Sequence, residues 1–365
     1  MVSIARKNLF HEKTRLSISI GGVAAAVMLI LFLAGVFEGF LVLYSSYIIN
    51  SGADVWVASD GWRDFHSVSM LPRSLNDTIL QVDGVKSVEN IILLQSSAFK
   101  AGEKEIAAVL VGFNPDTGIG GPWKMHKGIS RINSGEVIVD RYLAHKNDLK
   151  IGDEIEVSTE KFIIAGISED TNFVMYQIIF MRIEDASQIL NLREIVTFFL
   201  VKANNPSEVA DRISTQVPGV TAYTSEEYVE RAFAFMESFN PFFYIMIAAG
   251  FIVGISIIGI TIYTLTMERQ KEFGVLKAIG ASNRQLYTIV LKQSLLIATL
   301  GFVVGTTLVA ISSFIIPEFM PELVVFISPS MLFITFITST LMGIASSYLP
   351  VRRIAKIDPA IVFKA

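Results

Sequence analysis

Four long apolar stretches constrain the fold of this chain more than any other feature of its sequence. They cover residues 16–49, 241–267, 286–316 and 331–349. Each is near or above the roughly 20 residues that a helix needs to cross about 30 Å of hydrocarbon. The first stretch is too long for the apolar region of a signal peptide, which covers about 7–15 residues, and no small-residue cleavage site follows it. The sequence therefore predicts four transmembrane helices.

A polar block of residues 50–240 separates the first apolar stretch from the second. Hydrophobic residues make up 52% of the whole chain and charged residues only 18%, whereas a soluble domain carries about 25% charged residues. The chain contains no cysteine, which excludes disulfides and metal–thiolate sites. The predicted fold class is a membrane α-helical protein with four transmembrane helices and an α+β extracytoplasmic domain inserted between helices 1 and 2.

This pattern predicts nine consecutive segments. They are a cytoplasmic amphipathic segment (1–15), transmembrane helix 1 (16–49), the extracytoplasmic domain (50–240), transmembrane helix 2 (241–267), a cytoplasmic loop (268–285), transmembrane helix 3 (286–316), an external loop (317–330), transmembrane helix 4 (331–349) and a cytoplasmic tail (350–365).

The distribution of charge predicts the orientation in the membrane. Segments 1–15, 268–285 and 350–365 each carry four basic residues, whereas loop 317–330 carries Glu318 and Glu322 and no basic residue. Short loops rich in Lys and Arg remain in the cytoplasm. Both termini are therefore expected inside a multi-pass protein of the cell membrane, in contact with lipid. The inserted block has a net charge of −10, which argues against nucleic acid as its partner.

The inserted block shows the signals of short strands and helices. Runs rich in β-branched residues predict strands at 54–57, 87–94, 106–111, 136–139, 154–157 and 162–167. Helices are expected at 74–81, 141–147, 183–190, 206–216 and 225–239. The order of the strands in a sheet does not follow from these patterns.

The sequence lacks the motifs of a catalytic or metal-binding chain. No G-x-x-x-x-G-K-[ST] loop for ATP phosphates occurs, and the four histidines are isolated, without metal-ligand spacing. We therefore expect a non-catalytic subunit with no catalytic residue, no metal site and no cofactor of its own. If ATP drives this protein, then ATP and magnesium bind to a separate ATPase.

Three glycine pairs have the spacing that allows close helix approach in lipid. We predict helix packing through Gly35 and Gly39, Gly250 and Gly254, and Gly301 and Gly305. The spacing leaves open whether these faces pack within one chain or between two copies.

The cytoplasmic loop is the most specific stretch of the sequence. After its charged beginning, apolar residues recur at Val275, Leu276 and Ile279 before Gly280 ends the pattern. A short helix of this kind could offer an apolar ridge with flanking charges to a groove on a partner. A solvated connector is the alternative.

These residues resemble the MacB/FtsX-type permeases of ABC transporters. The loop is similar to the family pattern E-R-x-x-E-[IF]-G-[VI]-L-[KR]-A-[IL]-G-A through its residues 268–281. The beginning of the chain resembles the family through Ala5, Asn8, Leu9, Lys13, Arg15, Leu16 and Gly21. The end does so through Pro350, Arg352, Arg353, Ala355, Asp358 and Pro359.

The resemblance implies a homodimeric permease that works with two copies of an ABC ATP-binding subunit. The loop would be the helix that couples this ATPase to the permease. The coupling residues implied are Glu268, Arg269, Glu272, Phe273, Gly274, Leu276, Lys277 and Gly280. The function implied is export driven by ATP hydrolysis on the separate chain. No docking signature in the inserted block identifies a periplasmic adaptor, so that partner stays open.

An aromatic crowd near the outer end of the second helix favours a hydrophobic or amphipathic substrate. The residues expected to contact it are Met236, Glu237, Phe239, Phe243 and Glu38. The alternative is that these phenylalanines anchor the membrane interface and that Glu38 is an ordinary interfacial residue. Another function also remains open, in which the complex transmits force or a signal to an extracytoplasmic protein. A receptor without any ATPase is the third hypothesis.

Overall fold

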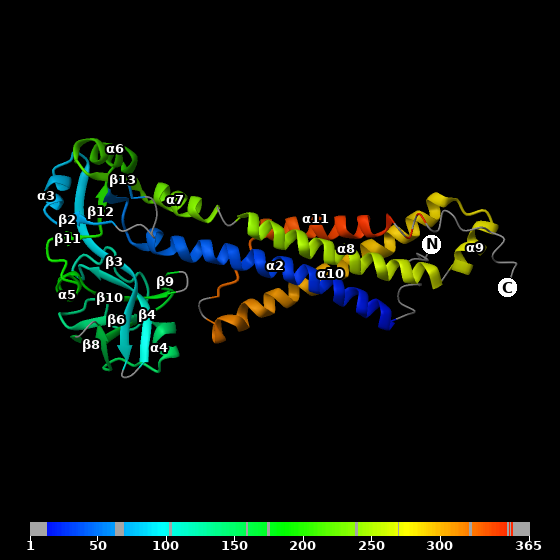
Figure 1. Cartoon of the computed structure of the whole chain (residues 1–365), viewed down its shortest axis with the longest axis horizontal. Helices are drawn as coiled ribbons and strands as arrows, with labels where there is room; N and C mark the ends of the chain where they lie inside the picture. Colours follow the sequence, from blue (N-terminus) through cyan, green and yellow to red (C-terminus); the bar gives the residue numbers. More distant parts are fainter. Residues whose placement is uncertain are drawn as a thin grey trace. The chain divides into compact units, whose positions relative to one another are not determined.

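The computed structural model describes residues 13–62, 69–101, 104–157, 160–173, 176–237, 240–268, 270–320 and 323–348, together with residues 350 and 352. The chain forms two compact units (Figure 1). We call Met1–Gly39 together with Phe239–Ala365 the membrane unit, and Phe40–Ser238 the inserted domain. Helix α2 (Lys13–Asn50) contributes to both, because the boundary falls after Gly39.

The described part of the inserted domain contains a sheet of eleven strands. The main path runs β13-β1-β12-β3-β4-β10-β6-β8-β5, while β7 pairs with β3 and β8, and β9 pairs with β10. A separate two-stranded sheet pairs β11 with β2. The strands are β1 (Val55–Ser59), β2 (Leu71–Pro72), β3 (Val85–Ala101), β4 (Lys104–Phe113), β5 (Met125–Gly128), β6 (Glu136–Asp140), β7 (Glu154–Val157), β8 (Glu160–Ser168), β9 (Asn172–Phe173), β10 (Tyr176–Arg182), β11 (Ile195–Val196), β12 (Phe198–Ala203) and β13 (Val220–Thr224).

Strand β3 joins the two halves of this sheet. Its first half pairs antiparallel with β12, where Phe198 lies opposite Ile91. Its second half pairs antiparallel with β4 and, near its end, with β7. One continuous strand therefore belongs to both halves, which ties them together through backbone hydrogen bonds.

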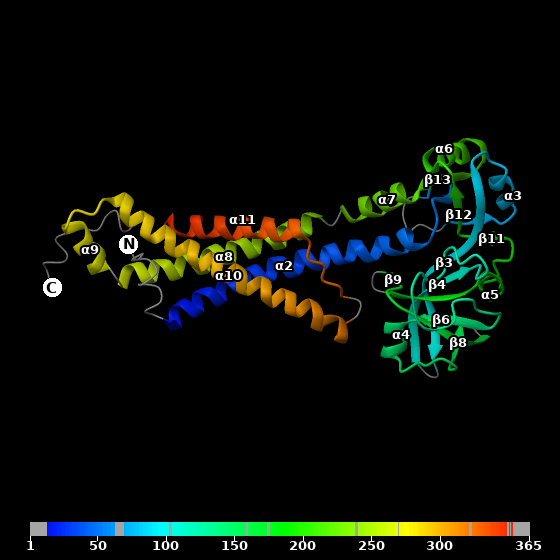
Figure 2. The same cartoon turned by 180° about the vertical axis from the view of Figure 1, so that it is seen from behind.

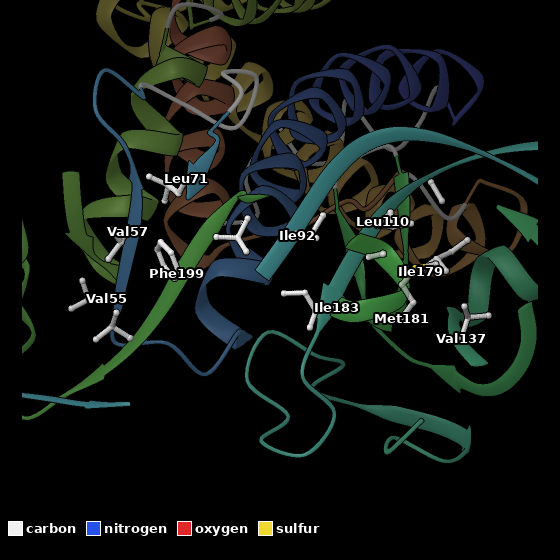
Figure 3. Close-up of a cluster of buried hydrophobic side chains, with 14 of the residues drawn as sticks. Val55, Val57, Leu71, Ile92, Leu110, Val137, Ile179, Met181, Ile183 and Phe199 are labelled. Atoms are coloured by element: carbon white, nitrogen blue, oxygen red, sulfur yellow. The ribbon is translucent and has the colours of Figure 1, made fainter. Parts of the chain in front are cut away.

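Alternating side chains of the sheet form two separate cores, as the two-residue period of a strand requires. Figure 3 shows the first core, in which Val55, Ile92 and Ile179 lie with other aliphatic side chains. Buried residues of four helices complete this core. These helices are α3 (Leu75–Leu80), α4 (Arg141–Lys146), α5 (Ile183–Ile189) and α6 (Pro206–Gln216).

The second core is aromatic and holds the helices that lead out of the domain. Tyr228 of helix α7 (Ser225–Glu237) stacks on the rings of both Trp56 and Trp62, with centroids 4.9 and 4.7 Å away. The end of α2 packs in the same core through Tyr47, whose hydroxyl donates a hydrogen bond to the carbonyl oxygen of Gly120 at 2.8 Å. The ends of α2 and α7 are thus fixed to one sheet.

The membrane unit consists of long apolar helices and one short helix. The remaining helices are α8 (Asn240–Glu268), α9 (Gln270–Ala278), α10 (Asn283–Phe319) and α11 (Pro329–Ser346). Figures 1 and 2 show α8, α10 and α11 side by side, and these helices contact one another. Among the described residues, α2, α8, α10 and α11 are long and apolar enough to cross a membrane. The prediction of four transmembrane helices is confirmed.

Every helix and strand predicted for the inserted domain has an observed counterpart. Each of the five predicted helices and six predicted strands overlaps an observed element, and helix α6 has the predicted bounds. Strand β3 extends well beyond the predicted 87–94. Strands β2, β5, β9, β10, β11, β12 and β13 were not predicted. Residues 1–12 of the predicted amphipathic segment and most of the predicted tail lie outside the described residues.

Candidate functional site

Helix α9 lies in the predicted cytoplasmic loop and has one side buried in the membrane unit. Phe273 is only 4% exposed and belongs to the core of the four long helices. Gly274 is also buried, and the half-buried Leu276 packs against the same core. Phe273 and Leu276 are three residues apart, so they share one helix face. This inward face anchors α9 to its own chain.

Exposed apolar residues lie on the opposite side, one within α9 and one directly after its last residue. Val275 is 43% exposed and Ile279, one turn later, is 75% exposed. We call this pair the α9 ridge. The predicted ridge also included Leu276, but that residue faces inward. Exposed Lys271 and Glu272 lie on the same short helix, so the ridge is apolar with charges beside it.

The predicted coupling residues therefore divide into two groups. Phe273, Gly274 and Leu276 face the chain's own core, while Glu268, Glu272 and Gly280 are exposed and Lys277 is half-buried. Arg269 lies outside the described residues. Gly280 has φ +97°, a left-handed conformation that glycine adopts without steric cost.

The glycine pairs of α8 and α10 contact other helices of the same chain. A side chain at Gly250 would meet Ile30 of α2, and one at Gly254 would meet Met342 of α11. A side chain at Gly301 or Gly305 would meet the backbone of Ala24 in α2. Within this chain, these four glycines occupy helix–helix contacts.

The first glycine pair differs from the expectation of helix packing. Gly35 and Gly39 face the extended segment 323–328, which we call the strap. The backbone N–H of Phe326 donates to the carbonyl oxygen of Gly35 at 2.9 Å. An extended chain near a bilayer must find partners for its backbone groups, and the missing side chains let the strap approach α2 closely enough to do so.

Glu38 lies where the strap ends. Its carboxylate accepts a hydrogen bond from Ser328 Oγ at 3.3 Å, and Ser328 caps helix α11 by accepting from the N–H of Met331. The N-terminus of a helix carries partial positive charge, which favours a nearby carboxylate. In this structure, Glu38 therefore links α2 to the start of α11.

Of the residues predicted to contact substrate, Phe243 has a described aromatic neighbour in the membrane unit. Its ring centroid lies 4.2 Å from that of Phe37 on α2, and Phe242, which is 60% exposed, lies beside it. Met236 and Glu237 are in the last turn of α7, but their side chains, like all of Phe239, lie outside the described residues. The described residues contain no cluster of three potential metal ligands.

Three features of these sites are not among the predictions. Phe37 was not grouped with Phe243, because the contact joins two helices that are far apart in sequence. Ser328 followed by Pro329 is a helix-start signal, and it would have extended the predicted fourth helix to the observed start. The spacing of Ser282 and Gln285 is that of a capping box, and it was also missed.

Two family models match most of the chain. Residues 16–216 match the MacB-like periplasmic core domain, and residues 244–359 match the FtsX-like permease C-terminal region. A hemin transport system permease protein, HrtB, from Staphylococcus haemolyticus is 21% identical over 338 residues, which are 91% of this chain and 90% of that protein. An uncharacterized ABC transporter permease of Mycobacterium tuberculosis is 24% identical over 372 residues, covering 100% of this chain and 99% of that protein.

Among solved structures, the periplasmic region of MacB from Actinobacillus actinomycetemcomitans is similar to this chain. It is 14% identical, with a TM-score of 0.38, and the match covers 49% of this chain and 92% of that region.

Proposed function

The chain belongs to the MacB/FtsX-type permeases of ABC transporters, and from this membership we propose that it is the membrane subunit of an exporter driven by a separate ATPase. Two copies of the chain would associate with two copies of an ABC ATP-binding subunit, which holds ATP and magnesium. ATP hydrolysis there would change the conformation of the inserted, extracytoplasmic domain. The protein would lie in the cell membrane with both termini in the cytoplasm.

The two-sided helix α9 is the observation that carries this proposal. Phe273 fixes the helix to the core of the membrane unit, while Val275 and Ile279 leave an apolar ridge exposed. A helix that presents an apolar face to a groove is a recurring mode of protein recognition. The ATPase would bind the α9 ridge and transmit its movement to the four long helices through Phe273 and Leu276.

The glycine contacts bear on the proposed homodimer. Because the pairs on α8 and α10 are occupied within the chain, a second copy would have to use other surfaces. Helix α8 has the smallest buried share of the four candidate spans, at 22%. Its exposed residues Ile245, Ile252 and Ile260 leave most of that helix to lipid or to a partner.

We propose a hydrophobic or amphipathic substrate that is taken up at the outer end of the membrane unit. The contact between Phe37 and Phe243 and the exposed ring of Phe242 supply an apolar surface there. Relatives are named for hemin transport and macrolide export, and both names describe transport. These names favour export over the signalling alternative. Purification of the chain with its bound partners would show whether a periplasmic adaptor takes part.

The experiment that tests this function is affinity purification of the chain from native membranes in mild detergent, with mass spectrometry of the proteins retained. We expect a P-loop ATPase in stoichiometric amount. Substituting Gly274→Pro should remove a backbone donor inside α9 and destabilise that helix by about 3 kcal/mol. Export should then fail, although the protein still inserts into the membrane.

The control for this variant is Gly274→Ala, which keeps the backbone N–H. Glu272→Lys, which reverses an exposed charge beside the α9 ridge, should also weaken the coupling of hydrolysis to export. Normal export by the proline variant would contradict the role assigned to α9. Absence of any ATPase, even with non-hydrolysable nucleotide present, would favour a receptor.

The proposed substrate surface can be tested separately. We expect Phe243→Ala, and the double variant Met236→Ala with Glu237→Ala, to reduce resistance of cells to the exported compound. The matched control is Tyr263→Ala on the same helix, about 30 Å further along at 1.5 Å per residue, where the ring is 40% exposed. Unchanged resistance in both test variants would rule out this surface, while ATPase binding would be unaffected.

A further inference from the structure

The junction between α9 and α10 is short, and each of its backbone N–H groups donates a hydrogen bond. Helix α9 ends at Ala278 and α10 begins at Asn283, so four residues, 279–282, connect them. A glycine in such a connection could mark either a flexible hinge or a fixed cap. The hydrogen bonds around Gly280 distinguish these alternatives.

Gly280 closes α9 with a Schellman motif. Its own N–H donates to the carbonyl oxygen of Lys277 at 3.0 Å, and the next N–H, of Ala281, donates to that of Leu276 at 2.9 Å. This pair of bonds requires a left-handed residue between helix and exit, and Gly280 has φ +97°. The glycine is therefore a cap with a defined conformation.

Ser282 starts α10 with a capping box. Gln285 Oε1 accepts from the N–H of Ser282 at 2.9 Å, and Ser282 Oγ accepts in return from the N–H of Gln285. This reciprocal arrangement satisfies two donors that a helix start otherwise leaves without helical partners. The first turn of α10 is thus fixed by these hydrogen bonds.

Apolar contacts hold the junction from the inside. Ala281, between the two caps, packs against the same core as Leu276 of α9 and the fully buried Leu286 of α10. An apolar residue just before an N-cap, paired with one in the first turn, fixes the angle at which the chain enters a helix. The end of α9 and the start of α10 therefore pack on the same hydrophobic core.

We propose that residues 279–282 form a rigid elbow, and that Gly280, Ser282 and Gln285 are positioning residues which make α9 and α10 move as one body. The inference rests on the proposed coupling role of α9. Movement that the ATPase imposes on the α9 ridge would then reach the whole length of α10, 37 residues, without being absorbed at the junction. A hinge at Gly280 would instead let α9 move alone.

Spin labels measure the stiffness of the elbow directly. The chain has no cysteine, so Lys271→Cys on α9 and Thr288→Cys on α10, both at exposed positions, label only these sites. Mixing the labelled chain with an excess of unlabelled chain in nanodiscs leaves most labelled dimers with one labelled copy. The measured distance is then the distance between the two labels of that copy. We expect one narrow distance distribution, which stays at the same mean when the ATPase binds and hydrolyses ATP.

Two variants loosen the elbow and two matched controls preserve it. Ser282→Ala removes the oxygen that caps α10. This loss should shift the equilibrium between the rigid and the loosened elbow by about fivefold toward the loosened form. Gly280→Val places a β-branched residue at positive φ. Ser282→Thr keeps a cap oxygen. Gly280→Asn introduces asparagine, which adopts the left-handed conformation more readily than other residues with side chains. We expect broader distributions for the first two variants only.

The functional readout separates positioning from folding. In the Ser282→Ala variant we expect the ATPase to remain bound and active, while export per ATP hydrolysed falls by up to about fivefold, in line with the loss of the cap. The two control variants should export as the unmodified chain does. A broad distribution in the unmodified chain, or full export by the loosened variants, would overturn the elbow alone. If no ATPase binds the unmodified chain, the proposed function fails and this inference fails with it.

Discussion

Replacing Tyr228 with alanine is expected to destabilise the inserted domain strongly. The ring is fully buried between Trp56 and Trp62, and Phe198 meets its edge at 6.2 Å. Truncating a buried aromatic side chain to alanine costs about 3–5 kcal/mol. A domain has only about 5–15 kcal/mol of stability, so a large part would be lost.

Tryptophan fluorescence can report this loss in the full-length protein. All three tryptophans, Trp56, Trp62 and Trp123, lie in the inserted domain, so their emission follows its unfolding in urea without a signal from the membrane helices. The midpoint of the transition is the quantity to compare, because removing Tyr228 also changes the emission of the rings stacked on it.

The matched control is Tyr228→Phe, which keeps the stacked ring. We expect its midpoint to remain close to that of the unmodified protein. An alanine variant that unfolds at the same urea concentration as the control would show that this core does not hold α7 to the sheet.

The sequence predicts the elements of the fold better than their arrangement. Helix α6 has the predicted bounds because Pro206 marks its start and its apolar residues recur with helical spacing. Strands β10 and β12 were missed because they are nearly continuous apolar runs, buried on both sides of the sheet, and periodicity alone does not identify such runs. The place of β12 between β1 and β3, and that of β10 between β4 and β6, depend on pairings between distant segments.

The same limit applies to the candidate sites. Charges and the family pattern located the loop that contains α9, but which apolar residues of α9 face inward depends on the core formed by the other helices. Phe273 is buried and Ile279 is exposed, although both are apolar. Likewise, the spacing of Gly35 and Gly39 indicated that something approaches α2 closely. Only the structure shows that it is the strap.

Replacing Gly305 with leucine is expected to destabilise the membrane unit. The first side-chain carbon would lie 2.7 Å from the carbonyl oxygen of Ala24 and 2.9 Å from Cβ of Val27. Neither atom is the end of a flexible side chain, so α10 and α2 would have to separate. Overpacking of this kind costs about 1–3 kcal/mol and occasionally more, and small residues are what allow helices to approach closely in lipid.

Gly21 provides the matched control for this substitution. It lies on α2 in the same membrane unit, and a side chain there would meet nothing within 4 Å. After heating in detergent, size-exclusion chromatography should show loss of folded protein for Gly305→Leu at temperatures that the Gly21→Leu variant survives. Equal survival would mean that α10 does not pack on α2 through this face. A Gly305→Leu variant that stays folded but no longer dimerises would assign the glycine pair to the contact between two copies instead.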